Sequence, residues 1–89
     1  MIIMIEELGE SGLRILLFLG KKKEANISTL KKELYMGSAG VYSALSYLFK
    51  YGLVKKERRG KERVISITEK GAKVVEKLLE ADQLIKEDT

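Results

Sequence analysis

The 89-residue sequence contains no cysteine, histidine, tryptophan or proline. Without cysteine and histidine the chain lacks the ligands of Cys/His zinc sites, disulfide frameworks and thiol-based redox sensors. The same absence excludes Ser-His-Asp and Cys-His nucleophiles and a histidine general base. Both aspartates, Asp82 and Asp88, stand near the C-terminal end, and the segment Gly20-Lys-Lys-Lys lacks the spacing of a phosphate-binding loop. We therefore expect a protein that is not an enzyme and that has no metal and no other cofactor.

Long apolar runs are also missing. The run from Leu13 to Leu19 is shorter than the about 20 residues that cross a bilayer, and Glu6 and Glu7 interrupt the apolar segment at the start of the chain. A cytoplasmic protein with a single domain is expected from this pattern and length. Lysine and glutamate are abundant, whereas asparagine and glutamine occur once each, a composition that indicates a thermophilic source.

The formal net charge of +4 is unevenly distributed along the chain. Residues 1–20 carry a net charge of −2, residues 21–63 carry +8, and residues 64–89 carry −2. A basic central block between mildly acidic ends indicates a polyanionic partner for the middle of the chain and another role for the ends. The alternative is a lysine-rich surface that only solvates the protein.

Three helices are predicted in the first half of the chain from caps and apolar spacing. They cover 11–20 with Ser11 as cap and Gly20 as end, 29–36 capped by Ser28 and stopped by Gly37, and 39–51 capped by Ser38 and ended by Gly52. The first helix is apolar on nearly every face, which predicts a central, buried position. The third carries one apolar stripe formed by Val41, Ala44, Leu45 and Leu48. Residues 25–27 are long enough only for a short extended stretch.

Two charged segments of partial alternation follow, 53–58 and 63–67, joined by Arg59-Gly60-Lys61-Glu62. This pattern predicts a β-hairpin with a glycine turn. Thr68 then caps a long last helix that reaches about Glu87. The order helix, short strand, helix, helix, hairpin, helix predicts an α+β, mostly helical fold: a winged helix-turn-helix (α-β-α-α-β-β-α) with a long C-terminal helix.

Four motifs in register carry a resemblance to a known group. They are Ile27-Ser-Thr-Leu-Lys-Lys-Glu-Leu, Val41-Tyr-Ser-Ala-Leu, Gly52-Leu-Val and Thr68-Glu-Lys-Gly71. With these motifs the chain resembles the winged-helix DNA-binding transcriptional regulators of the broad MarR, ArsR and PadR kind, over roughly residues 11–80. The resemblance implies binding to double-stranded DNA and an archaeal source. The sequence departs from the metal-sensing and thiol-sensing members, because it has neither cysteine nor histidine.

The resemblance also implies which residues meet DNA. In this fold the third helix enters the major groove and the hairpin, or wing, reaches toward the backbone or the minor groove. The helix positions expected to contact DNA are Ser38, Ala39, Gly40, Tyr42, Ser43, Ser46 and Lys50. The wing positions are Lys56, Arg58, Arg59, Lys61 and Arg63. Tyr42 could instead pack on the second helix, and the wing charges could instead protect a sheet edge from aggregation.

Two details refine this expectation. Arg59 and Lys61 flank Gly60 at the predicted tip, so Arg59 is the first choice for contact with a phosphate or a narrow minor groove. Arginine, lysine, asparagine and glutamine read guanine or adenine through pairs of hydrogen bonds. The exposed positions of the third helix that precede Lys50 contain none of these residues. We therefore hypothesise affinity from phosphates and only modest sequence discrimination.

The ends of the chain are predicted to form a homodimer interface. Its residues would be Ile2, Ile5, Leu8, Val74, Leu78, Ala81 and Ile85, the last four spaced as a heptad-like seam. The predicted division is thus an apolar extension (1–10), a DNA-binding domain (11–67) and a dimerisation helix (68–89). Alternatively, both ends fold back over the core of one monomer.

The leading interpretation is a homodimeric transcriptional regulator, a repressor that occludes a promoter. A second interpretation is an abundant architectural DNA-binding protein similar to the small dimeric winged-helix chromatin proteins of archaea. A third is a winged helix used as a protein-interaction module, against which the cationic wing argues. No constellation of ionisable residues indicates a pocket for a small effector.

Overall fold

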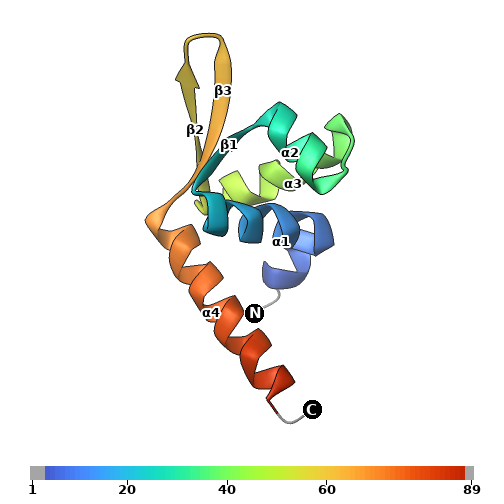
Figure 1. Ribbon diagram of the computed structural model, residues 1–89, viewed down its shortest axis with the longest axis vertical. Helices are drawn as coiled ribbons and strands as arrows, with labels where there is room; N and C mark the ends of the chain where they lie inside the picture. Colours follow the sequence, from blue (N-terminus) through green and yellow to red (C-terminus); the bar gives the residue numbers. More distant parts are fainter. Residues whose placement is uncertain (1–3, 88–89) are drawn as a thin grey trace.

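The computed structural model describes the backbone of residues 4–87 and the side chains of residues 7–87. The elements in chain order are α1 (Met4–Lys22), β1 (Glu24–Asn26), α2 (Ile27–Leu34), α3 (Ser38–Lys50), β2 (Val54–Arg59), β3 (Glu62–Ile67) and α4 (Glu69–Lys86) (Figure 1). This is the predicted α+β winged helix-turn-helix with a long last helix, and the predicted order of elements is confirmed.

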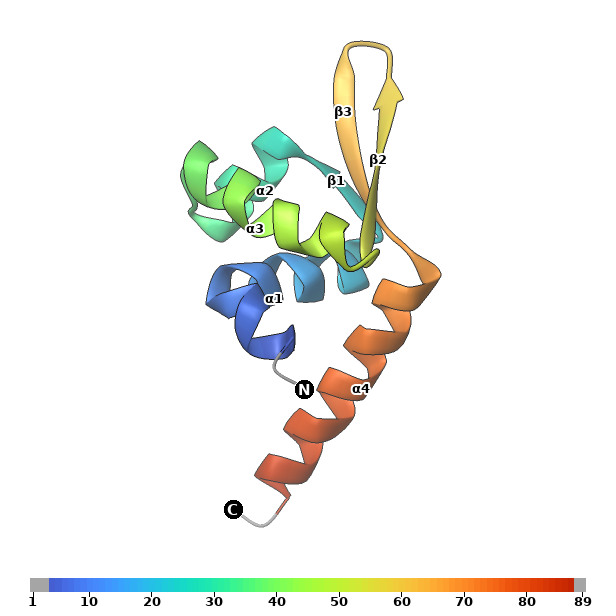
Figure 2. The same ribbon diagram turned by 180° about the vertical axis from the view of Figure 1, so that it is seen from behind.

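The three strands form one antiparallel sheet in the order β1-β3-β2. β2 and β3 pair along their whole length, from Val54 opposite Ile67 to Arg59 opposite Glu62. β1 pairs with only the inner half of β3, so the outer half of the hairpin rises beyond it as a two-stranded wing (Figures 1 and 2). The turn of the wing is Gly60-Lys61, and Gly60 has the positive φ of 63° that a tight two-residue hairpin turn requires.

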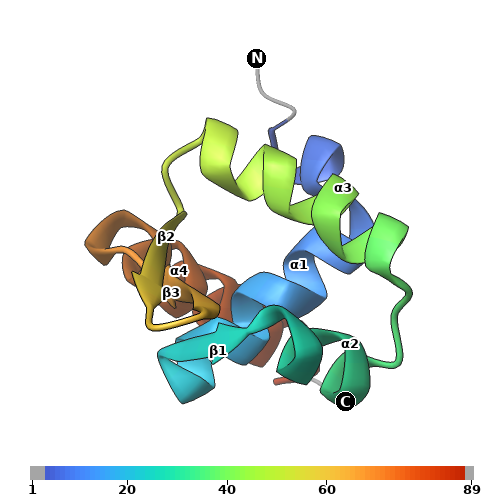
Figure 3. The same cartoon turned by 90° about the horizontal axis from the view of Figure 1, so that it is seen from above.

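The core lies between α1, α3 and the sheet. Its fully buried side chains include Leu16 and Leu19 of α1, Leu45 and Leu48 of α3, and Ile65 of β3. Seen from above, α1 passes beneath α3 and the sheet stands at one side of both helices (Figure 3). The apolar stripe predicted for α3 is confirmed, since all four of its members are buried. Burial of α1 on every side is not found, because Leu17 is 38% exposed.

α1 is longer than predicted. It begins at Met4, bends at Gly9, where φ is 67° and ψ is 178°, and continues past Gly20 to Lys22. Gly20 therefore does not end the helix, and Lys23, with φ of 77°, takes the left-handed conformation instead. A Cβ added at Gly20 would lie 2.8 Å from Cγ1 of Val75, so this glycine permits α1 and α4 to approach closely.

The caps of α2 also differ from prediction. Asn26, not Ser28, is the N-cap, and its side-chain oxygen accepts a hydrogen bond from the backbone N–H of Thr29 at 2.8 Å. At the other end Tyr35 takes the left-handed conformation with φ of 54°, whereas Gly37 has φ of −79° and caps α3. α3 accordingly includes Ser38 as its first residue.

The junction of α3, the wing and α4 follows the prediction. Gly52 ends α3 with φ of 72°, and its N–H donates to the carbonyl of Phe49. Thr68 caps α4 by accepting from the N–H of Gly71 at 3.0 Å, and its hydroxyl donates to the carbonyl of Gly52 at 2.7 Å. The cap of the last helix is thereby tied to the start of the wing.

The distal half of α4 extends away from the rest of the molecule (Figures 1 and 2). Within residues 4–87, no helix combines the length and the apolar character needed to span a membrane.

Candidate nucleic-acid interface

The seven positions of α3 predicted to meet DNA are all exposed: Ser38, Ala39, Gly40, Tyr42, Ser43, Ser46 and Lys50. They divide into three groups around the helix, because successive residues are 100° apart. Ala39, Ser43, Ser46 and Lys50 lie opposite the buried stripe, Ser38 and Tyr42 lie on one flank, and Gly40 lies on the other. The Gly40 flank also carries Tyr47, and both line a shallow hollow with Leu8 to Ser11 of α1.

Tyr42 stands on the flank that faces the wing. Its side chain is 50% exposed and lines a groove of about 290 Å³. The groove is completed by the end of β1 and the start of α2 (Asn26, Ile27 and Ser28) and by the wing turn and the start of β3 (Lys61, Glu62 and Arg63). Two segments that lie 14 to 21 residues from Tyr42 in the sequence thus meet around this tyrosine.

Two polar side chains of α3 already have partners in the molecule. The hydroxyl of Ser46 donates to the carbonyl of Ser43 at 2.8 Å, so its proton is used within the helix. The ammonium of Lys50 lies 5.4 Å from the centre of the Tyr51 ring, within cation–π range. The exposed side of α3 therefore offers few free donors for base edges.

The two faces of the wing have different charges. Residues directly opposite each other in an antiparallel pair share a face, and residues two apart on one strand do so as well. Arg58 is directly opposite Arg63, and Lys56 is opposite Ile65. These three cations therefore share the face of Val54 and Ile65, whose side chains pack into the core with residues of α1 and α3.

All three cations of this face, Lys56, Arg58 and Arg63, are exposed. Among the described residues, none of them forms a hydrogen bond or an ion pair. Like charges directly opposite each other destabilise a sheet. The outer part of this face is thus a concentration of positive charge that an external anion would relieve.

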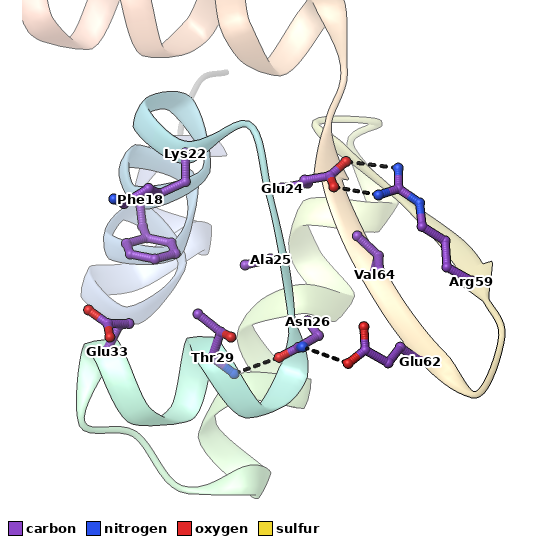
Figure 4. A pocket seen from close by; sticks show the side chains of 10 residues that line it. All are labelled: Phe18, Lys22, Glu24, Ala25, Asn26, Thr29, Glu33, Arg59, Glu62 and Val64. Carbon is purple, nitrogen blue, oxygen red and sulfur yellow. Dashed lines mark hydrogen bonds and ion pairs between the residues drawn. The ribbon is translucent and has the colours of Figure 1, made fainter.

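The opposite face of the wing carries Lys55, Glu57 and Arg59. Arg59 is the last residue of β2, so its predicted placement in the turn is wrong. Its guanidinium binds both carboxylate oxygens of Glu24 in β1 (Figure 4). It also binds one oxygen of Glu57 at 3.1 Å. The hydrogen bond from Arg59 lowers the pKa of the Glu24 carboxyl below its ordinary value, and the favourable charge of Arg59 adds to this. Of the two residues predicted to flank the tip, only Lys61 lies in the turn.

Sequence reasoning missed exposed aromatic side chains near α3. Tyr35, in the turn before α3, is 93% exposed, and Phe49 is also exposed on the same flank of the helix as Tyr42. The position of Tyr35 after the last apolar residue of α2 was the available signal. An aromatic residue in a left-handed turn is uncommon, because its Cβ crowds the backbone there.

The predicted dimer residues fall into two groups. Leu8 is only 6% exposed and packs in the core of its own chain. Val74 and Leu78 pack partly against that core, whereas Ala81 and Ile85 are exposed on the projecting half of α4, Ile85 by 75%. Ile2 and the side chain of Ile5 lie outside the described residues.

In the part of the chain that the structure describes, no three acidic side chains gather as they would around a metal ion. A hollow of about 480 Å³ lies on the wing face that carries Arg59 and is lined by Phe18, Glu24, Arg59 and their neighbours (Figure 4).

No protein-family model and no curated protein sequence matches the chain. Solved structures do match it. The transcriptional regulator homologue protein from Pyrococcus horikoshii OT3 has a TM-score of 0.76 and 23% identity, with 92% of each chain covered. The transcriptional regulator HlyU from Vibrio vulnificus CMCP6 has a TM-score of 0.72 and 19% identity, with 86% of this chain and 81% of that chain covered.

Reduced AbfR bound to DNA is a third similar structure, with a TM-score of 0.73 and 25% identity. The match covers 81% of this chain and 54% of that chain. These similarities agree with the resemblance carried by the four sequence motifs. The chain has the winged-helix fold of transcriptional regulators, archaeal ones among them.

Proposed function

We propose that the protein is a DNA-binding transcriptional regulator, a repressor that binds duplex DNA in the cytoplasm as a homodimer. The observation that carries the proposal is the cationic wing face formed by Lys56, Arg58 and Arg63 beside α3. Phosphate contacts dominate the affinity of proteins for DNA, and guanidinium groups suit phosphate geometry. The wing turn and Tyr42 border one groove, which supports simultaneous contact of the wing and α3 with a single duplex.

In this proposal α3 lies in the major groove. Its first turn, with Ser38, Ala39 and Tyr42, approaches the base edges, while Lys50 and the wing meet the backbone. Arg58 and Arg63 replace Arg59 as the expected first contacts, because Arg59 is bound to acidic residues on the other face. Lys61 remains a candidate contact at the wing turn.

Wing variants test the proposal through the salt dependence of binding. Binding of a fluorescent duplex is measured for Lys56→Gln, Arg58→Gln and Arg63→Gln at several salt concentrations. Each wing variant should weaken binding and lower the salt slope by about one ion, because one phosphate contact is lost. Lys21→Gln, an equal change of charge at an exposed position near the end of α1, is the matched control and should leave the slope unchanged. Unchanged slopes in all three wing variants would refute the interface.

We further propose that the exposed seam of α4 forms the homodimer. Val74, Leu78 and Ala81 line an apolar groove of about 360 Å³, with Lys70, Lys73 and Lys77 along its edge. Ile85 continues the seam on the half of the helix that extends from the body. Dimers of DNA-binding domains address paired half-sites, so this assignment accords with the proposed function. Residues 68–89 would then be the dimerisation helix and residues 11–67 the DNA-binding domain.

Matched lysine substitutions on the distal half of α4 test the dimer. Ile85→Lys places a charge in the seam, whereas Gln83→Lys places the same charge on the other side of the helix. Analytical ultracentrifugation should show that Ile85→Lys shifts the protein to monomers and that Gln83→Lys does not. Truncation after Glu80 should have the effect of Ile85→Lys. A truncated chain that still sediments as a dimer would exclude the C-terminal interface.

A second candidate, an architectural protein of low sequence specificity, is favoured by the side chains of α3. The positions opposite the buried stripe and before Lys50 are only alanine and serine, namely Ala39, Ser43 and Ser46, and Ser46 uses its proton inside the helix. Binding to a site selected from random duplexes is compared with binding to random duplex at equal salt. A ratio well above about 10⁴ would exclude the architectural role.

A further inference from the structure

The wing face that carries Lys55, Glu57 and Arg59 contains an ion-pair cluster that joins all three strands. Arg59 of β2 donates to both carboxylate oxygens of Glu24 in β1, one of these contacts measuring 2.8 Å. Its Nη2 also donates to Glu57, which accepts a hydrogen bond from the hydroxyl of Ser66 in β3 at 3.2 Å. Two parallel contacts between one guanidinium and one carboxylate fix the relative orientation of the two groups.

The register shows which way the Arg59 side chain runs. Glu24 is opposite Ser66, near the base of β3, whereas Arg59 is opposite Glu62, four residues closer to the wing turn. The side chain of Arg59 therefore reaches back from the outer end of the wing, across β3, to the base of the sheet (Figure 4). β1 and β2 are not neighbours in the sheet, so this pair is a direct link between them.

A second link lies nearby. The side-chain amide of Asn26 donates to the carboxylate of Glu62 at 3.3 Å, and the same side chain caps α2. The outer half of the wing is thus held to β1 and, through Asn26, to the helix-turn-helix. A hairpin that extends beyond its third strand is otherwise free to twist, because two-stranded ribbons are only marginally stable by themselves.

We propose that Glu24 and Arg59 are positioning residues for DNA binding: their ion pair fixes the angle of the wing and so the place of Arg58 and Arg63 relative to α3. The inference rests on the proposed function. It assigns to Glu24, an acidic residue, a favourable effect on the binding of a polyanion. Arg59 acts through the wing and makes no contact with phosphate.

Neutralising Glu24 tests the proposal, because positioning and general electrostatics predict opposite changes in Kd. Glu24→Gln raises the net charge of the protein, so general electrostatics would tighten DNA binding. Positioning has the opposite effect, because a wing that spends only part of its time at the productive angle lowers the apparent affinity by that fraction. We expect Kd to rise by about 2- to 5-fold. Glu33→Gln, which removes a charge from the wall of the same hollow without breaking an ion pair, is the control and should leave Kd unchanged or slightly lower.

The salt slope and a charge swap separate positioning from contact. Arg59→Gln should weaken binding with an unchanged slope, whereas a lost phosphate contact would lower the slope by about one ion. The double variant Glu24→Arg/Arg59→Glu keeps the net charge and restores an ion pair in reverse. It should recover an affinity within about 2-fold of the wild type, because the wing angle is again fixed. The proposal would be overturned if Glu24→Gln bound DNA as tightly as the wild type or more tightly. It would also be overturned if the double variant did not recover affinity and Arg59→Gln lowered the salt slope.

A measurement without DNA separates this inference from the proposed function. Amide hydrogen exchange of residues 58–63 in the free protein should become faster in Glu24→Gln and in Arg59→Gln, and should return toward the wild-type rate in the swap. If the wild type binds no DNA but these exchange rates change as expected, the proposed function is wrong and the Glu24–Arg59 pair still holds the wing. If the wild type binds DNA and the exchange rates do not change, the pair does not hold the wing and the proposed function stands.

Discussion

Replacing Gly71 with alanine should destabilise the protein strongly. Gly71 is the last residue of the Thr-x-x-Gly motif at the start of α4, and a Cβ built on it would lie 2.1 Å from the carbonyl oxygen of Leu53 and 2.9 Å from Cγ1 of Ile67. The first neighbour is backbone at the start of the wing, so it cannot rotate away. To make room, Leu53 must move and weaken the hydrogen bond that its carbonyl accepts from the N–H of Thr68 at 3.1 Å.

Two costs add up in this variant. Overpacking of a filled site costs about 1–3 kcal/mol, and a lost backbone hydrogen bond costs about 1 kcal/mol more. We expect the free energy of unfolding to fall by about 2–4 kcal/mol and the Tm by roughly 10–20 °C. This is a large share of the total stability of a small domain. The same displacement should shift the first residues of the wing, since Leu53 directly precedes β2.

Thermal and urea unfolding followed by circular dichroism measure the effect at one fixed protein concentration, because dimerisation would make Tm concentration-dependent. Gly40→Ala is the control with the opposite sign. At that position in α3 the nearest atom to an added Cβ is Cε of Met36 at 3.7 Å, so alanine should stabilise the helix by about 0.5–1 kcal/mol. A Gly71→Ala protein that melts within about 2 °C of the wild type would refute the close approach of α4 to the wing.

Three further predictions concern caps and charges. In urea titrations, Thr68→Ala should lower the free energy of unfolding by about 1–2 kcal/mol, because the cap of α4 and the hydrogen bond to Gly52 are both lost. Thr68→Ser keeps the hydroxyl and should retain most of the wild-type stability. Tyr35→Gly should raise stability by about 0.5–1 kcal/mol in the same titrations, since glycine adopts the left-handed conformation without strain; a loss would mean that the Tyr35 ring is packed. At pH 7 the wild type should have a higher Tm than Glu24→Gln. This difference should shrink as the pH falls below the ordinary carboxyl value of 4.5 and should vanish once the pH has passed below the lowered pKa of Glu24, because the protonated carboxyl no longer pairs with Arg59.

The sequence was sufficient for the fold because each element has local signals that agree with its tertiary packing. The stripe of α3 from Val41 to Leu48 and the cap at Thr68 are examples in which spacing and cap chemistry point the same way. Gly52 was predictable for the same reason, because a glycine after a helix and before an apolar residue is typical of a left-handed end.

Errors arose where one residue type serves two purposes. Gly20 was interpreted as a helix end, but its missing side chain is needed for the approach of Val75 across the α1–α4 contact. No local pattern distinguishes these uses. Likewise Asn26 and Ser28 can both cap a helix, and the choice depends on the pairing of Asn26 with Val64, which holds Asn26 in an extended conformation.

The candidate site was predictable in composition but only partly in geometry. The wing charges could have been divided between faces from the sequence, because Val54, Ile65 and Ile67 are apolar and must face the core. Alternation from those residues places Arg58 and Arg63 on the same face of the sheet as the core residues, farther out along the wing, and Arg59 on the opposite face. The partner of Arg59 was beyond such reasoning, since Glu24 is 35 residues away and is brought near only by the pairing of β1 with β3.

This division of faces changes how the positive charge of the central block should be interpreted. A count of cations treats Arg58 and Arg59 as equivalent neighbours, yet one faces outward beside α3 without a partner among residues 7–87, and the other is held by two glutamates. An arginine between two carboxylates has little net charge left to attract a polyanion, because its field is largely cancelled at distances beyond the pair. In the proposed interface, the cations that act on DNA are therefore those of one wing face, and their position depends on acidic residues that lower the total charge. Acidic residues and DNA affinity are compatible in this proposal because the acids fix the geometry that the free arginines require.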